Sequence, residues 1–224
     1  MTDPKQQLTT AEIDDSGLGD WRLVCNRLKA RFLTGDFATG LALVDRIGAA
    51  AEAADHHPDV TLTYPEVIVA LSSHDVRGIT SRDIELARKI SEFAAEMGVS
   101  ADVAGLTQLE LGLDTARGDQ LAGFYAALLG GEVKDGEPVD ASGQVPTVWW
   151  QETDREHDEF ALPAAGHEQR WHFDVWVPAD DAERRVQAVL EAGGTLVSDA
   201  AAPAYWVVAD ADGNRSCICT PAGR

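Results

Sequence analysis

The second half of the chain contains an internal repeat, and this repeat restricts its possible fold more than any other feature. Each copy consists of a strand, a helix closed by a Gly-Gly pair, and further strand-like residues, and the second copy follows the first by about 62 residues. The expected strands are 108–113, 145–151, 171–177 and 205–220, and the expected helices are 118–129 and 181–191. A repeated order of elements indicates repeated supersecondary units. We therefore predict a duplicated βαβββ domain over residues 107–224.

The first half has a different organisation, with two amphipathic helices around short strands. Residues 36–54 and 81–97 carry apolar side chains at helical spacing, and Asp36 is a suitable N-cap. Alternating or β-branched residues predict one or two strands within 21–33 and a hairpin formed by 60–64 and 67–71. These elements predict a two-layer α+β unit. It is expected to cover residues 1–100, with the weakly patterned segment 99–106 as the domain boundary.

Three of the six histidines lie close together around the expected hairpin. His56 and His57 precede the hairpin and His74 follows it, so the turn should bring them near one another. Imidazole is the side chain best suited to move protons near neutral pH, which predicts a general acid–base site. A zinc site is the alternative, but no cysteine is nearby and the histidines lack the helical spacing of a zinc protease. Asp83 belongs to Thr80-x-x-Asp83, close to a capping box, so it either caps the next helix or serves the site.

Three motifs follow one another in the first half: His56-His57-Pro58, Ser73-His74-Asp75 and Gly78-Ile79-Thr80-x-x-Asp83. Their order and spacing resemble the pterin-4a-carbinolamine dehydratase family over residues 8–98. The resemblance implies an antiparallel sheet with helices on one face. It also implies dehydration of a 4a-hydroxytetrahydropterin to the quinonoid dihydropterin, without a metal or redox cofactor. The roles implied are proton transfer for His57 and His74, substrate orientation or a share in the proton transfer for His56, and tautomer control for Asp83 if it is not merely a cap. We also expect Asp75 and Arg77 to contact the substrate.

Three positions depart from the family pattern. Val60 replaces a tryptophan, Pro65 replaces an asparagine, and Arg77 replaces one glycine of a Gly-Gly pair. None of these changes removes a histidine. Arg77 is expected to narrow the mouth of the pocket or to place a cation beside it.

The repeat in the second half has Phe124-Tyr125 in its first helix and Asp210–Asn214 near its end. With these features it resembles the vicinal-oxygen-chelate superfamily, especially its glyoxalase-like members, over residues 107–221. Members often hold a divalent metal through the first and last strands of each module. The corresponding positions here are Glu110, 149–151, His172 and Cys217. Only Glu110 and His172 are ordinary ligands at these places, so we expect no metal.

The second domain is instead expected to bind a flat organic ligand in a cavity walled by aromatic side chains. Trp149 and His172 are the residues expected to contact this ligand. Cys217 and Cys219 fall on one face of a strand and are expected to belong to the core.

Composition limits the partners and the compartment. The formal net charge of −20 argues against nucleic acid and anionic membranes, which require clustered Lys and Arg. Three cysteines and the lack of a leader-like or membrane-spanning apolar run predict a reduced cytoplasmic protein. The dehydratase resemblance adds self-association as a homodimer or homotetramer.

Three functions therefore remain open at the level of sequence. The first is dehydration of the pterin carbinolamine by histidine acid–base catalysis. The second is binding of a pterin or another small molecule without turnover. The third is metal-dependent lyase or dioxygenase chemistry in the second domain.

Overall fold

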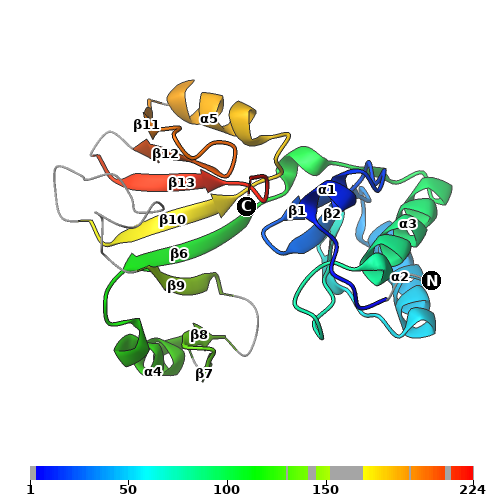
Figure 1. The fold of residues 1–224 in the computed structure, drawn as a ribbon. Helices are drawn as coiled ribbons and strands as arrows, with labels where there is room; N and C mark the ends of the chain where they lie inside the picture. The colour runs from blue at the N-terminus through cyan, green and yellow to red at the C-terminus, as the bar shows by residue number, and fades with distance from the viewer. Residues whose placement is uncertain are drawn as a thin grey trace. The chain divides into compact units, whose positions relative to one another are not determined.

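The computed structural model describes residues 4–129, 131–140, 145–151, 169–191, 193–209 and 213–223. The chain divides into two compact units, Met1–Leu106 and Thr107–Arg224 (Figure 1). The loop that contains His157 and His167, and the segment 210–212 of the second resemblance, lie outside the described residues. No helix in the described part of the chain is long and apolar enough to span a bilayer.

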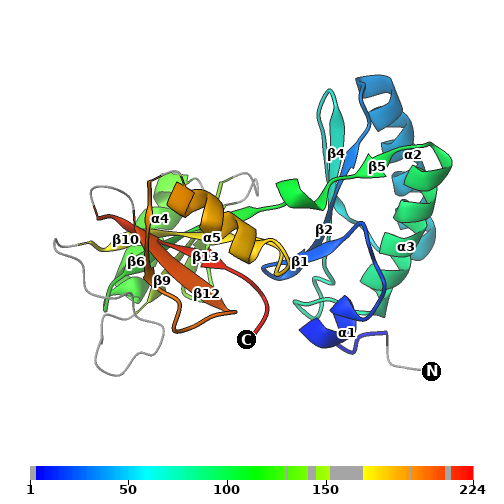
Figure 2. The ribbon, with the colours of Figure 1, turned by 90° about the horizontal axis from the view of Figure 1, so that it is seen from above.

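The first unit is a five-stranded antiparallel sheet with two long helices. The strand order is β1-β2-β4-β3, and β5 pairs with β2. In chain order the elements are α1 (Thr10–Asp14), β1 (Arg22–Val24), β2 (Arg27–Leu33), α2 (Phe37–Ala54), β3 (Asp59–Leu62), β4 (Glu66–Leu71), α3 (Ser81–Glu96), β5 (Ser100–Ala101) and the 3₁₀ turn η1 (Val103–Gly105). Figure 2 shows α2 and α3 on the same side of the sheet, as the dehydratase resemblance implied.

Buried side chains alternate with partly exposed ones along the central strands, and the buried ones form the core of this unit. β2 and β4 bury every second residue, and their ladder pairs buried residues such as Phe32 with Val67 and Leu28 with Leu71. Helices α2 and α3 cover this face with Leu43, Ile47, Ile90 and other apolar side chains. Because strand side chains alternate between faces, one register fixes which residues meet the helices.

Local capping sets the ends of both long helices. Asp36 accepts a hydrogen bond from the N–H of Thr39 at 2.8 Å and caps α2. Thr80 and Asp83 form a capping box at the start of α3. Each cap satisfies N–H groups that have no partner within the helix.

The second unit is built from two βαβββ modules, which confirms the predicted duplication. Its six-stranded sheet has the order β11-β12-β13-β10-β6-β9, and β7 and β8 form a separate pair. The first module contains β6 (Gln108–Asp114), α4 (Gly118–Leu129), β7 (Glu132–Lys134), β8 (Glu137–Val139) and β9 (Thr147–Gln151). The second contains β10 (Trp171–Trp176), α5 (Ala182–Glu191), β11 (Thr195–Ser198), β12 (Tyr205–Ala209) and β13 (Arg215–Cys219).

The two faces of the second sheet differ in chemistry. On one face, α5 packs on Val175, Val208 and Ile218, and Tyr125 of α4 contacts Trp150 and Trp171. The ladders place Gly112, Trp149, His172, Asp174, Cys217 and Cys219 on the opposite face. The helices therefore cover an apolar face, and the other face carries buried polar and sulfur groups.

Candidate functional site

A buried carboxylate, Asp83, joins the two histidine-bearing segments of the first unit. Its Oδ1 accepts a hydrogen bond from Nε2 of His56 at 2.8 Å, and its Oδ2 accepts one from Oγ of Ser73 at 2.7 Å. His57 directly follows His56, and His74 directly follows Ser73. One carboxylate therefore anchors both segments that carry the expected proton-transfer groups.

Asp83 also caps helix α3. Its Oδ2 accepts the backbone N–H of Thr80 at 2.8 Å, in the capping box at the start of the helix. The sequence left open whether Asp83 is a cap or a histidine partner, and the structure shows that it is both. The ring nitrogen of His56 that faces this carboxylate is Nε2, so the contact fixes the orientation of the imidazole.

The end of helix α2 places His56 beside this carboxylate. Asp55, the C-cap, adopts the left-handed conformation with φ 49°. The chain then turns back, and the N–H of His56 donates to the carbonyl of Ala51 at 3.1 Å. As a result the His56 side chain is buried immediately after an exposed helix end.

His57 and His74, in contrast, are exposed. Nε2 of His57 lies 3.0 Å from Oε1 of Glu52, and both side chains are open to solvent. Within the described residues, no hydrogen bond or ion pair joins His74 to another group or the two exposed rings to each other. The imidazoles of His57 and His74 are therefore accessible to a ligand, whereas the His56 ring is held in place by its hydrogen bond to Asp83.

The loop that carries His74 is held by ion pairs and a bridge. Ser73 and Gly78 form an isolated β-bridge that closes it. Asp75 accepts a hydrogen bond from Nη2 of Arg82 at 2.7 Å and lies 3.2 Å from Nζ of Lys5. The Arg82 guanidinium lowers the pKa of Asp75 to about 2. Asp75, an expected substrate contact, is thus already engaged by two cations.

Arg77 lies in the same loop with φ 54°, in the left-handed region that favours glycine. Its side chain is exposed. Arg77 therefore adopts the left-handed backbone conformation, which the glycine that it replaces in the family pattern would adopt without strain.

A small cavity reaches His56 from the side of the helices. Its volume is about 250 Å³, and its lining includes Leu86, Arg82 and Lys89. His56 is therefore not sealed on every side, although it is mostly buried.

The second unit carries a cluster of buried groups on its polar sheet face. His172 and Asp174 lie on β10 and Cys217 on β13, and each offers one atom within 4.8 Å of the others. Nε2 of His172 lies 3.5 Å from Oδ1 of Asp174. Burial lowers the pKa of His172 to about 4, so its imidazole is neutral near neutral pH.

Two further residues shape the space around His172. Gly112 lies directly opposite it in the β6–β10 ladder, and a Cβ there would come within 2.5 Å of the imidazole. Trp149 stands edge-on to the ring, with centroids 5.9 Å apart. Within the described residues, neither Nδ1 of His172 nor Nε1 of Trp149 has a hydrogen-bond partner.

The four positions expected from the superfamily do not form a complete metal set. Glu110 accepts a hydrogen bond from Nε1 of Trp176 at 2.9 Å, and Trp149 offers no ordinary ligand atom. The residue that sequence reasoning missed is Asp174. Its signal was present, because the alternation His172-x-Asp174 in a strand places both side chains on one face.

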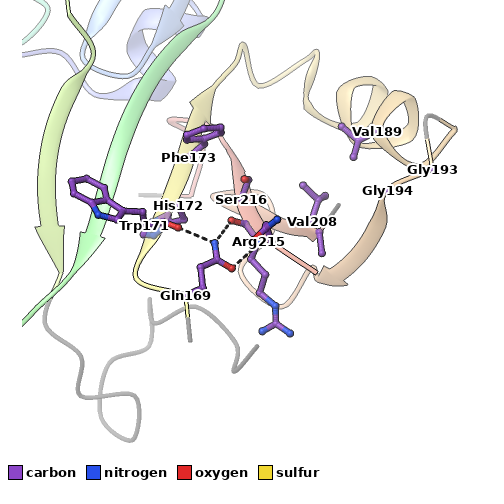
Figure 3. A pocket seen from close by; sticks show the side chains of 12 residues that line it. Gln169, Trp171, His172, Phe173, Val189, Gly193, Gly194, Val208, Arg215 and Ser216 are labelled. Carbon is purple, nitrogen blue, oxygen red and sulfur yellow. Dashed lines mark hydrogen bonds between the residues drawn. The ribbon is translucent and has the colours of Figure 1, made fainter. Parts of the chain in front are cut away.

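A larger cavity lies on the helix-covered face of the same sheet. Its volume is about 640 Å³. Figure 3 shows Trp171 and Phe173 across from Val189 and Val208 in its lining. The amide of Gln169 donates to the carbonyls of Trp171 at 2.9 Å and Arg215 at 2.7 Å. His172 also lines this cavity, so the second unit has aromatic walls beside one of the two residues expected to contact a ligand, whereas Trp149 is not part of the lining.

The fold and the sites define a two-domain α+β protein, with a histidine–carboxylate site in the first domain and a duplicated βαβββ second domain. The pterin 4 alpha carbinolamine dehydratase family model matches residues 6–93, and a glyoxalase-like domain model matches residues 110–219. The chain belongs to the pterin-4a-carbinolamine dehydratase family and carries a glyoxalase-like domain after the dehydratase domain.

The relatives described here match the N-terminal part of this chain. A candidate pterin-4-alpha-carbinolamine dehydratase of Thermosynechococcus vestitus is 41% identical over 91 residues, which cover 40% of this chain and 96% of the relative. One from Nocardia farcinica is 40% identical over 89 residues, covering 40% of this chain and 90% of the relative. A crystal structure described as a transcriptional coactivator/pterin dehydratase from Brucella melitensis is 31% identical. It covers 40% of this chain and 99% of the solved chain, with a TM-score of 0.39.

Proposed function

We propose that the first domain dehydrates a 4a-hydroxytetrahydropterin to the quinonoid dihydropterin. The observation that carries this proposal is the Asp83 junction, which ties the segment of His57 and the loop of His74 to one buried carboxylate. The two accessible imidazoles directly follow the two residues that are hydrogen-bonded to this carboxylate. The family membership of this domain supports the choice of a pterin as substrate.

The reaction requires one proton to be delivered and one to be removed. The C4a–oxygen bond breaks as a proton reaches the departing hydroxyl, which leaves as water. A proton leaves the neighbouring ring nitrogen, and its electron pair forms the new C–N double bond. No electron is gained or lost overall, so acid–base groups are sufficient.

His57 and His74 serve as this acid–base pair in the proposal. One must be protonated and the other neutral, a division accessible to imidazole near neutral pH. Both rings are exposed, so water can restore their protonation states after each turnover. His56, held on Asp83, is a positioning residue that fixes the segment leading to His57.

A direct test uses the full-length protein and freshly generated carbinolamine. The proposal predicts dehydration faster than in buffer alone, followed by the appearance of the quinonoid product. No acceleration over buffer would instead support the second function, a protein that binds a pterin without turnover. Arg77 at the loop of His74 is the feature that favours this alternative.

We also propose that the protein works in the cytoplasm as a homodimer or homotetramer. None of its three cysteines is in a disulfide. β3 is an edge strand with exposed residues, and α2 presents Phe37 and Leu41 to solvent. An open strand edge or an apolar helix face can form a self-complementary contact.

A further inference from the structure

We propose that the second domain binds one zinc ion through His172, Asp174 and Cys217, all supplied by its second module. This site is independent of the dehydratase reaction. It also differs from the superfamily arrangement, in which both modules supply ligands. We expected no metal because only Glu110 and His172 are ordinary ligands at the superfamily positions, and Asp174 is not one of those positions.

The strand register brings the three ligand atoms together. β10 and β13 are parallel neighbours, and Asp174 lies directly opposite Cys217. His172 precedes Asp174 by two residues and points to the same face. Their candidate ligand atoms lie within 4.8 Å of one another, and the Nε2–Oδ1 pair is at 3.5 Å. Ligand atoms around a tetrahedral zinc are about 3.3–3.8 Å apart, so only small side-chain movements are needed.

The surroundings of the cluster are those of a formed site. His172, Asp174 and Cys217 are 4%, 6% and 5% exposed. Gly112 leaves the space that the imidazole occupies, because a side chain at this position would collide with the ring.

The imidazole also has a suitable outer partner. When Nε2 binds a metal, Nδ1 carries the proton and usually donates it to a carboxylate or carbonyl. Nδ1 of His172 has no hydrogen-bond partner among the described residues, and Oδ1 of Asp114 lies 4.0 Å away. A small shift would complete a carboxylate–histidine–metal arrangement.

The donor set identifies the class of ion and ligand. One nitrogen, one oxygen and one thiolate suit zinc better than the hard ions calcium and magnesium. Metal binding releases the thiol proton of Cys217, because the thiolate is the ligand. Three protein ligands leave the fourth position for water or for an oxygen donor of a small organic molecule, next to the Trp149 indole.

Metal binding by the full-length chain tests this site without reference to any activity. The chelator-stripped protein is titrated with zinc and, separately, with cobalt(II). We expect one ion per chain, and a thiolate-to-cobalt charge-transfer band in the near ultraviolet. Cys217→Ser should abolish the band, whereas Cys219→Ser, on the same face of the same strand, and Cys25→Ser should keep it.

Two further variants separate coordination from folding. Asp174→Asn should reduce zinc affinity by more than the roughly 10–100-fold loss typical when a group that orients a ligand is removed. Asp114→Asn should show a loss within that range. Circular dichroism and cobalt spectra are recorded for each variant. The proposal is overturned if the wild-type chain takes up no stoichiometric ion, if the thiolate band survives Cys217→Ser, or if folded Asp174→Asn binds zinc as tightly as the wild type.

Discussion

At the scale of single residues, Asp83 connects the groups on which the proposed dehydratase function depends. It connects a helix cap, a buried imidazole and the loop of His74 through the two oxygens of one carboxylate. A cap alone requires only a hydrogen-bond acceptor at this position. With the added contact to His56 the group is fully buried, whereas Asp36, the cap of α2, is exposed.

Asp83→Asn should reveal this double role. The amide cannot accept at both oxygen positions, which leaves buried donors unpaired at a cost of about 1–3 kcal/mol each. We expect lower stability in urea, a fall in kcat of at least about tenfold, and an altered pH–rate profile. Glu12→Gln is the matched control, because Glu12 closes an exposed capping box at Thr9 that touches no histidine. Equal effects of both changes on kcat would indicate that Asp83 acts as a cap alone.

Arg77→Gly should stabilise the protein. A left-handed backbone costs a residue with a side chain about 1–2 kcal/mol, and glycine avoids this cost. The added freedom of glycine in the unfolded chain offsets about 0.4–1 kcal/mol. We therefore expect a gain of between about 0 and 1.6 kcal/mol in the free energy of unfolding, measured by urea denaturation. A loss of stability would show that contacts of the Arg77 side chain outweigh the backbone strain.

At the scale of elements, the end of α2 determines where the first histidine lies. Asp55 has φ 49°, and His56 follows it into the interior. Asp55→Val should destabilise the fold by about 1–2 kcal/mol, because a β-branched residue resists this conformation, and should reduce dehydration by misplacing His56. Asp55→Gly is the control and should preserve both properties. Equal activity in the two variants would contradict the proposed role of this turn.

The elements also show what the sequence could predict. Helical spacing with Asp36 as cap located α2, the alternation at 67–71 located β4, and the repeat located both modules of the second unit. Periodicity could not show that Asp83 reaches His56, because this contact joins residues 27 positions apart through the folded core. The alternation His172-x-Asp174 places both side chains on one face, but the sequence alone did not reveal that Asp174 lies opposite Cys217 on a parallel neighbouring strand.

At the scale of the whole molecule, charge and apolar surface oppose each other in self-association. The net charge of −20 favours separation at low ionic strength, and salt screens this repulsion. Light scattering in moderate salt should therefore show a dimer or tetramer. Leu41→Ser, which removes an apolar side chain 46% exposed on α2, should weaken the assembly if the helix face is the contact. A wild-type monomer at moderate salt would contradict self-association.

The central claim is that the first domain is a dehydratase whose accessible histidines transfer protons. The most direct measurement is the rate of carbinolamine dehydration by the wild-type protein, His57→Ala and His74→Ala, with His167→Ala of the second domain as the control. General acid–base groups contribute about 10²–10⁴-fold, so each of the first two variants should lose activity by this factor while its circular dichroism spectrum is unchanged. The control should retain the wild-type rate. Rates near wild type for both His57→Ala and His74→Ala, with the fold intact, would contradict the account.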